Sequence, residues 1–325
     1  MRQLQKIFLS SLFSKVFLCL LAVAYIAYLV GFGHEVSLSL LFSSPAITVY
    51  QVNQSSASVR KYWTAANMSS AVNDDVLQVN SVDVQQSNAV SQGQAVQQKG
   101  QAPRNNAVDY PLSTVGKLFM TTAAGQNVVC SGTAVVSSNK SVVDTAGHCL
   151  YYFGGWMRNV LFCPLYNNGN GPYGCWVARD LEVPSDWIDA KPNELHHDYG
   201  MAVVSANAEG YLTDEVGGAG YAYNQPVNQP YYAYGYPAAY PFNGQTRQTC
   251  ESSSGKLWQY AGGTVVSIPC NMTGGSSGGP WYIKSGSNWY LDGHNDFTST
   301  IQPGHMFSPY YDEVWYALYS KAQQT

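Results

Sequence analysis

The chain has 325 residues, enough for one large domain or two modest ones with additional segments. Hydrophobic residues make up 46% of it and charged residues only 11%, with a formal net charge of −4. This composition allows a substantial core but carries no basic footprint, so nucleic acid is excluded as an expected partner. The low charge and the 25 tyrosines favour an extracellular or wall-associated protein.

An apolar run lies close to the N-terminus. Residues 16–30, VFLCLLAVAYIAYLV, follow the cationic residues Arg2, Lys6 and Lys15, which is typical of a secretory signal. A spanning helix needs about 20 apolar residues, which this run reaches only with its flanks. We expect residues 1–33 to be a cleaved signal peptide or, alternatively, a signal anchor. The rest of the chain is then secreted or held outside the cell, with membrane contact through this segment only.

The composition changes twice after the apolar run. Residues 64–109 lack aromatic residues and are rich in Gln, Asn, Ser and Val, so they have little to bury. We interpret residues 34–109 as a propeptide or linker and expect it to be flexible. From residue 110 onward, short β-branched or aromatic runs alternate with turn formers, which predicts an all-β sandwich or barrel.

The strand candidates follow one another along residues 110–325. The Tyr-, Pro- and Gly-rich region 221–244 is interpreted as an ordered loop. A helix is predicted near the end, where Tyr311, Val314, Trp315 and Leu318 fall on one face at helical spacing. The predicted strands are 117–121, 128–136, 141–146, 159–166, 175–183, 200–206, 265–270, 280–284 and 289–294.

Three short motifs carry a histidine, an aspartate and a serine, which are the residue types that nucleophilic catalysis by serine needs. They are VVDTAGHC with His148, HHDYGMAVV with Asp198, and TGGSSGGP with Ser277. A serine hydroxyl is a poor nucleophile unless a base takes its proton, and histidine has a suitable pKa. A carboxylate on the other ring nitrogen fixes the tautomer of the histidine. The glycines around Ser277 would let the backbone N–H groups of Gly275 and Ser277 receive the charge on an attacked carbonyl oxygen.

The segments TAGHC, DYGMAVV and GGSSGGP, in the order His, Asp, Ser, resemble the chymotrypsin-fold serine peptidases. The similarity is greatest to the secreted trypsin-like branch of bacteria and fungi, which includes glutamyl-endopeptidase-like enzymes, and it covers about 115–322. The resemblance implies a double six-stranded β-barrel with a C-terminal helix over residues 110–325. It also implies a serine endopeptidase that acts on protein or peptide substrates through an acyl-enzyme.

The resemblance further implies roles for single residues. His148 would be the general base, Asp198 its orienting carboxylate and Ser277 the nucleophile, with Gly275 and Ser277 forming the oxyanion hole. The alternative is a non-catalytic member of the same fold that acts as a binding or adhesion protein at the cell surface. We expect no cofactor, no required metal ion and a monomer.

Six cysteines lie beyond the apolar run, and an even set after an export signal predicts disulfides. Six cysteines allow 15 pairings, and the sequence alone does not choose among them. The resemblance suggests a Cys130–Cys149 bridge. Proximity along the chain favours the pairs Cys163–Cys175 and Cys250–Cys270.

Two departures from the family pattern concern activation and specificity. Ser276 stands where many animal members have an aspartate that captures a new N-terminus, so we expect activation by a cut between Arg104 and Tyr110 that removes the preceding segment. Asn271 stands where the trypsin group has an aspartate that attracts a basic side chain. The pocket therefore lacks the negative charge that favours cleavage after Lys or Arg. Either His294 or Asn295 would line the specificity pocket, and a pocket histidine would favour acidic side chains.

Overall fold

The computed structural model describes residues 44–73, 77–79, 85–87, 93–104, 109–152, 154–189, 195–260 and 263–325. The predicted signal segment, 1–33, lies outside these ranges, as do residues 34–43 of the predicted propeptide. Residues 45–325 form one compact unit. Among the described helices, none has the length and apolar character needed to cross a membrane.

The first half of the compact unit is a closed barrel of six strands. The sheet runs in the order β12, β11, β6, β7, β8, β13, and β13 pairs back onto β12. In β6, β8 and β13 every residue is buried, so both faces of these strands are covered. The strands are β6 (Val115–Thr121), β7 (Asn127–Val135), β8 (Val142–Ala146), β11 (Arg158–Pro164), β12 (Trp176–Pro184) and β13 (Tyr199–Val204).

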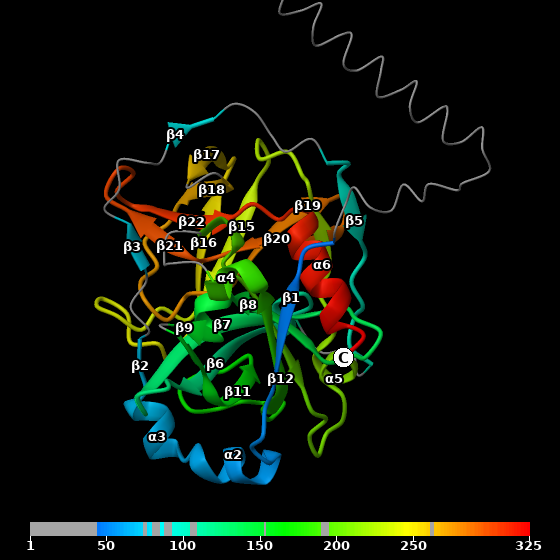
Figure 1. The fold of residues 1–325 in the computed structure, drawn as a ribbon, viewed down its shortest axis with the longest axis vertical. Helices are drawn as coiled ribbons and strands as arrows, with labels where there is room; N and C mark the ends of the chain where they lie inside the picture. The colour runs from blue at the N-terminus through cyan, green and yellow to red at the C-terminus, as the bar shows by residue number, and fades with distance from the viewer. Residues whose placement is uncertain are drawn as a thin grey trace, which may run out of the picture. The chain divides into compact units, whose positions relative to one another are not determined.

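The second half consists of two further sheets around a core that includes Trp281, Ile268 and Leu257. Figure 1 shows this half above the first barrel. The mostly β architecture confirms the predicted fold class. The strands are β14 (Gly220–Tyr223), β15 (Tyr231–Gly235), β16 (Gln248–Ser252), β17 (Lys256–Tyr260), β18 (Gly263–Pro269), β19 (Pro280–Ser285), β20 (Asn288–His294), β21 (Phe297–Ser299) and β22 (His305–Pro309).

Short elements connect and cover these sheets. The helix predicted near the C-terminus is present as α6 (Glu313–Ala322). The others are 3₁₀ turns η2 (Leu112–Thr114), η3 (Gly147–Cys149) and η4 (Leu195–His197), strands β9 (Tyr151–Tyr152) and β10 (Gly155–Trp156), and helices α4 (Ser185–Asp189) and α5 (Leu212–Val216).

The region 221–244 differs from the loop predicted there. It contains the end of β14 and the whole of β15, and Tyr231, Ala233 and Tyr236 are buried. The tyrosine rings supply the apolar faces of these strands, as aromatic residues do on a half-buried pleated surface. The flanking prolines and glycines obscured this pattern in the sequence.

Where the structure describes it, the segment 34–109 also differs from the flexible linker expected from its composition. In Figure 1 its strands lie along both halves of the unit. The segment gains order by adding to sheet edges of the two halves, which needs backbone pairing rather than a core of its own. Its elements are β1 (Ile47–Gln51), α2 (Ser56–Tyr62), α3 (Ala65–Ser70), β2 (Val72–Asn73), β3 (Leu77–Val79), β4 (Gln85–Gln86) and β5 (Val96–Gln98).

The helices of this segment dock on the first barrel. Ser55 caps α2 by accepting a hydrogen bond from the Ser58 backbone N–H. Val59 is fully buried, and the Trp63 indole Nε1 donates to the carbonyl of Asn159 at 2.6 Å. These contacts hold the segment against β11 and its neighbours.

A buried carboxylate ties α6 to the first barrel. Asp144 on β8 accepts hydrogen bonds from the Tyr311 hydroxyl and from the Trp315 indole, each at 2.8 Å. All three side chains are fully buried. Asp312 caps the N-terminus of this helix, and its side chain accepts from the N–H of Val314. Docking of α6 therefore depends on one acceptor that serves two buried donors.

Replacement of this acceptor is expected to be costly. Asp144→Ala leaves the buried Trp315 indole without its acceptor and the Tyr311 hydroxyl with His294 Nδ1 as its remaining neighbour, which should lower the free energy of unfolding by about 1–3 kcal/mol. Asp144→Asn keeps one acceptor oxygen and should cost less. Urea unfolding of the matured chain measures both, with the exposed Asp189→Ala as a control expected to stay within about 0.5 kcal/mol. Equal stabilities of the Asp144→Ala and Asp189→Ala chains would contradict this role.

Candidate active site

His148 lies at the end of β8, where the buried strand turns into η3. The preceding residue must be glycine, because a Cβ on Gly147 would come within 2.8 Å of the Asp198 carboxylate and 2.9 Å of the Tyr199 carbonyl. The Cys130–Cys149 disulfide joins the residue after His148 to β7. Strand, turn and disulfide together fix the position of the imidazole.

Asp198 is fully buried directly before β13 and binds His148 through both carboxylate oxygens. One oxygen accepts the backbone N–H of His148 at 2.7 Å, and the other is 2.8 Å from His148 Nδ1. This pair of contacts sets both the position and the orientation of the ring. With Nδ1 engaged, the second ring nitrogen, Nε2, is left to face another group.

The charges of this pair stabilise each other. Burial lowers the pKa of His148, but the charge and hydrogen bond of Asp198 outweigh it and hold the pKa well above the usual 6.5. Burial raises the pKa of Asp198, but the His148 charge and hydrogen bonds outweigh it and lower the pKa below its usual value. The carboxylate of Asp198 therefore favours the imidazolium form of its neighbour.

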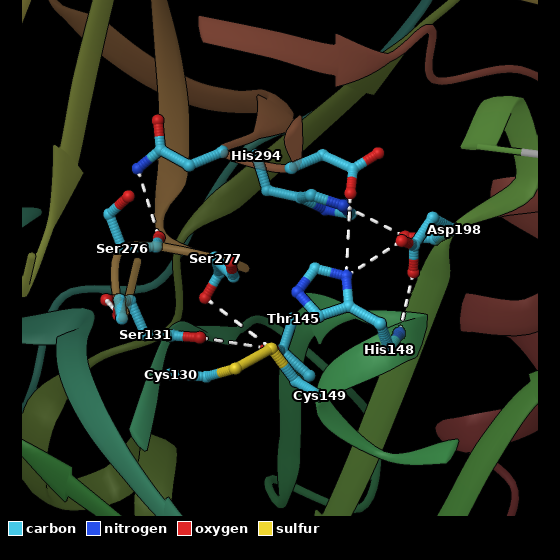
Figure 2. Close-up of a disulfide and its surroundings, with 12 residues drawn as sticks. Cys130, Ser131, Thr145, His148, Cys149, Asp198, Ser276, Ser277 and His294 are labelled. Carbon is cyan, nitrogen blue, oxygen red and sulfur yellow. Dashed lines mark hydrogen bonds and ion pairs between the residues drawn. A yellow bond between two sulfur atoms is a disulfide. The ribbon is translucent and has the colours of Figure 1, made fainter. Parts of the chain in front are cut away.

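Ser277 lies on the loop between β18 and β19, close to His148. Its carbonyl oxygen accepts from the Ser131 backbone N–H at 2.8 Å and lies 3.7 Å from the Cys149 Sγ. Figure 2 shows Ser277 on the side of the His148 ring away from Asp198. Ser277 Oγ and His148 Nε2 are both buried, and within the described part of the chain neither has a hydrogen-bond partner.

The backbone around Ser277 takes a conformation that needs glycine. Gly275 and Gly278 have φ values of +93° and +76°, in the left-handed region. A Cβ on Gly278 would come within 2.6 Å of the Ser131 carbonyl, so the loop packs tightly on β7. Among the described residues, no hydrogen bond occupies the backbone N–H groups of Gly275 and Ser277, whereas those of Ser276 and Gly278 are bonded.

The three residues considered for the specificity pocket lie in different surroundings. Asn271 is exposed. Asn295 is fully buried against the Ser277 loop, where its Nδ2 donates to the carbonyls of Tyr234 and Ser276 at 2.9 and 3.2 Å. Asn295 therefore contacts the carbonyl of the residue directly before Ser277, whereas Asn271 lies on the same loop with an exposed side chain.

His294 is placed differently from a pocket residue. Its Nε2 is 3.0 Å from the Asp198 carbonyl oxygen, and its Nδ1 is 2.9 Å from the Tyr311 hydroxyl. The side chain is fully buried, so both ring nitrogens are used inside the protein. This argues against the alternative in which His294 lines the pocket and favours acidic side chains, because the ring contacts the Asp198 backbone and Tyr311 instead.

The sequence analysis missed one residue of this cluster. The Asp296 side chain is fully buried and its Oδ1 lies 3.5 Å from His148 Nδ1. The signal was present, because Asp296 is a charged residue in LDGHNDF, immediately after an apolar strand, in a chain where charges are sparse.

The six cysteines beyond the apolar run form three disulfides in the structure. The pairs are Cys130–Cys149, Cys163–Cys175 and Cys250–Cys270. Two clusters in the described residues have a spacing that could suit a metal ion, one formed by the first pair with His148 and one by His148, Asp198 and Asp296. In the first, the sulfur atoms are used in the disulfide, and in the second Asp198 already binds His148 Nδ1.

Comparisons with known proteins place this arrangement in a family. No family model and no curated protein matches the chain. The crystal structure of AL20, a thermostable serine protease from an extremophilic microorganism, is 39% identical, covers 66% of this chain and 98% of its own, and has a TM-score of 0.59. The protease Anisep from Arthrobacter nicotinovorans is 36% identical, covers 70% of this chain and 100% of its own, and has a TM-score of 0.61. The chain belongs to the chymotrypsin-fold serine proteases.

A third solved structure extends the likeness of fold. A Glu endopeptidase in complex with MPD is 16% identical, covers 70% of this chain and 98% of its own, and has a TM-score of 0.53. At this identity the likeness concerns the fold alone. The protease described here is thus a serine endopeptidase, and the resemblance seen in its sequence motifs is confirmed.

Proposed function

We propose that the protein is an exported serine endopeptidase made as a zymogen, with His148 as general base, Asp198 as orienting carboxylate and Ser277 as nucleophile. The observation that carries the proposal is the binding of His148 Nδ1 by Asp198, which leaves Nε2 unpartnered on the side of Ser277. In this arrangement Nε2 takes the Ser277 hydroxyl proton as Oγ attacks a peptide carbonyl. The protonated ring then gives that proton to the leaving amine, and water releases the acyl group.

The backbone N–H groups of Gly275 and Ser277 form the oxyanion hole in this proposal. Their hydrogen-bonding capacity is unused among the described residues, and the positive φ of Gly275 supports an outward-facing N–H. Donors held in place by a packed loop stabilise the developing oxyanion without reorganisation. The substrates are proteins or peptides, as for the proteases to which the chain is similar.

Substrate preference follows from the groups beside the Ser277 loop. Asn271 carries no charge, and Asn295 presents an amide that is already bonded to backbone carbonyls. His294 is used behind Asp198. We therefore infer that none of these three residues places a charged side chain in the specificity pocket. They do not favour cleavage after Lys or Arg.

Residues 34–109 act as the prosegment and residues 110–325 as the enzyme. The relatives cover about two thirds of this chain and nearly all of their own, which is the share that residues 110–325 make up. Arg104 lies at the surface in an ion pair with Asp214, next to the expected cutting window that ends at Tyr110. N-terminal sequencing of the active form locates the cut.

Two strands of the prosegment lie against elements that flank the site. β2 pairs with the start of β7 at Val128 and Val129, directly before Cys130 of the disulfide beside His148. β3 pairs with β21, which begins directly after Asp296, and forms the end of that sheet. Because only three residues separate β2 from β3 in the sequence, the facing ends of these strands lie within about 15 Å. The prosegment thus fills the sheet edges that an extended substrate would use.

The uncleaved chain is expected to hydrolyse peptides with a kcat/KM about 100-fold below that of the matured enzyme, because the attached strand competes at a high effective concentration. Gln78→Pro in β3 removes a backbone donor from the strand and should raise the activity of the uncleaved chain. The matched control is Gln97→Pro in β5, which pairs with β14 instead. Initial rates before cleavage measure both, and an uncleaved wild-type chain as active as the matured one would contradict the zymogen.

The three disulfides of the chain support export. Three disulfides persist in an oxidising compartment, which lies beyond the cytoplasm for most organisms. Whether residues 1–33 are removed or retained as an anchor is answered by the mass of the chain recovered from the medium or from the membrane. The endopeptidase assignment is tested by incubating the matured chain with an unfolded protein: internal fragments are expected, and release of terminal amino acids alone would contradict it.

A further inference from the structure

A second carboxyl group shares the environment of the His148–Asp198 pair. Asp296 Oδ1 lies 3.5 Å from His148 Nδ1, the nitrogen that Asp198 already binds at 2.8 Å. One carboxylate oxygen of each aspartate and a ring nitrogen of His148 lie within 4.8 Å of one another. The Asp296 side chain is fully buried, and neither of its oxygens has a hydrogen-bond partner among the described residues. Such a buried, unsatisfied acid needs an explanation.

The position of Asp296 is fixed by the backbone on both sides. The Asp296 N–H donates to the Phe307 carbonyl at 2.9 Å, which ties it to β22. The Asn295 carbonyl accepts from the Gly278 N–H at 2.7 Å, which ties the preceding residue to the Ser277 loop. The backbone at Asp296 is therefore fixed by β22 and by the loop that carries Ser277. These contacts hold the carboxyl group toward the imidazole.

Two ionised carboxylates cannot both be accommodated beside one buried N–H. Burial raises the pKa of Asp296 well above its usual value, and the charge of Asp198 raises it further. The pKa of Asp198, in contrast, is lowered against burial by its closer contact with His148. The two acids are thereby separated into one that is charged and one that holds a proton, as in other pairs of neighbouring carboxyl groups with distinct surroundings.

We propose that Asp296 is a positioning residue for the general base: its carboxyl group holds a proton in the resting enzyme and lies beside the His148 N–H that Asp198 binds. This inference rests on the roles proposed for His148 and Asp198. The titratable groups that face Asp296 within the described residues are His148 on η3, Asp198 before β13 and Tyr199 on β13.

The proton on Asp296 keeps the imidazole available as a base. At pH values above the acid limb, Asp198 is charged while Asp296 and His148 are neutral, so the cluster carries one negative charge and the ring can take the Ser277 proton. If Asp296 loses its proton, a second negative charge beside the ring favours the imidazolium form, which cannot accept that proton. The three groups therefore titrate as one coupled unit, and the acid limb of the pH–rate profile belongs to the cluster.

The test is the pH dependence of kcat/KM in the matured enzyme. Asp296→Asn keeps the size and the neutral charge of the side chain, so the acid limb should stay within about 0.3 unit of wild type, whereas Asp296→Ala removes the group beside the ring and should lower kcat about tenfold. KM at the plateau should change little, because Asp296 acts through His148 rather than on the substrate. Asp292→Ala is the matched control for Asp296→Ala, since this buried acid on β20 contacts the Tyr231 hydroxyl instead of the His148 ring, and its kcat should stay within about twofold of wild type.

An acid limb of Asp296→Asn about one unit below the wild-type limb would overturn the proposal, because it would show that Asp296 is ionised in the wild-type enzyme. If Asp296→Asn does not fold, Asp296→Ser supplies a smaller side chain that likewise cannot ionise. NMR titration of the His148 ring in the wild-type enzyme gives an independent readout: two coupled steps are expected, and one simple step would contradict the inference. His148→Ala separates this result from the proposed function, because an active His148→Ala enzyme would overturn the role of the general base itself.

Discussion

Replacement of Ser277 by alanine is expected to lower kcat of the matured enzyme by about 10⁵- to 10⁶-fold. The reason is chemical: the Oγ beside His148 is the atom that forms the acyl-enzyme, and the alanine methyl group cannot attack a carbonyl. KM should change little, since the peptide still binds the sheet edges and the oxyanion donors remain. Steady-state hydrolysis of a peptide substrate measures both constants.

The neighbouring serine provides the control for this substitution. The Ser276 side chain donates to the Thr273 carbonyl at 2.8 Å and lies on the same loop. Ser276→Ala should therefore keep kcat within about tenfold of wild type, through the loss of one neutral hydrogen bond. Loss of activity in Ser276→Ala with retention in Ser277→Ala would reverse the assignment of the nucleophile.

The second large effect is expected for His148→Ala. Without the imidazole, the hydroxyl of Ser277 has no base, and kcat should fall by a similar 10⁵- to 10⁶-fold. Because the two residues act as one unit, the double variant should be no less active than either single variant. An additive loss would show that His148 and Ser277 work in separate steps, against the proposed mechanism.

The pH profile and a neighbouring histidine complete this prediction. The base form of His148 is the neutral one, so kcat/KM should fall as pH decreases through a pKa that lies above 6.5. His196→Ala changes a histidine two residues before Asp198 that makes no described contact with His148 or Ser277, and kcat should stay within about tenfold. A similar collapse in His196→Ala would point to local misfolding instead of lost base catalysis.

The strands and the C-terminal helix were predictable because local signals agree with the burial they obtain. The run 141–146 is buried along β8, and Trp315 and Leu318 are buried on α6 as their spacing predicts. The site was predictable because Gly147, Gly275 and Gly278 are required by close approach or by positive φ, and these glycines are what make the motifs specific.

The remaining features depend on tertiary contacts that local patterns do not carry. The Gln-rich segment forms strands only because sheet edges of the two halves accept them, and its own composition gives no apolar period. The environment of Asp296 is created by His148 and Asp198, which are far from it in sequence. Likewise, His294 was one of two alternatives for the pocket-lining residue, whereas its side chain lies between Asp198 and Tyr311.

The central claim is that His148 takes a proton from Ser277 in one buried site, and covalent labelling tests it most directly. The matured enzyme is treated with a fluorophosphonate and digested, and the modified residue is located by mass spectrometry. The account predicts a single adduct on Ser277 in the wild-type enzyme and none on the same residue in folded His148→Ala. An unlabelled Ser277 in folded, matured wild-type enzyme, or equal labelling in both proteins, would contradict it.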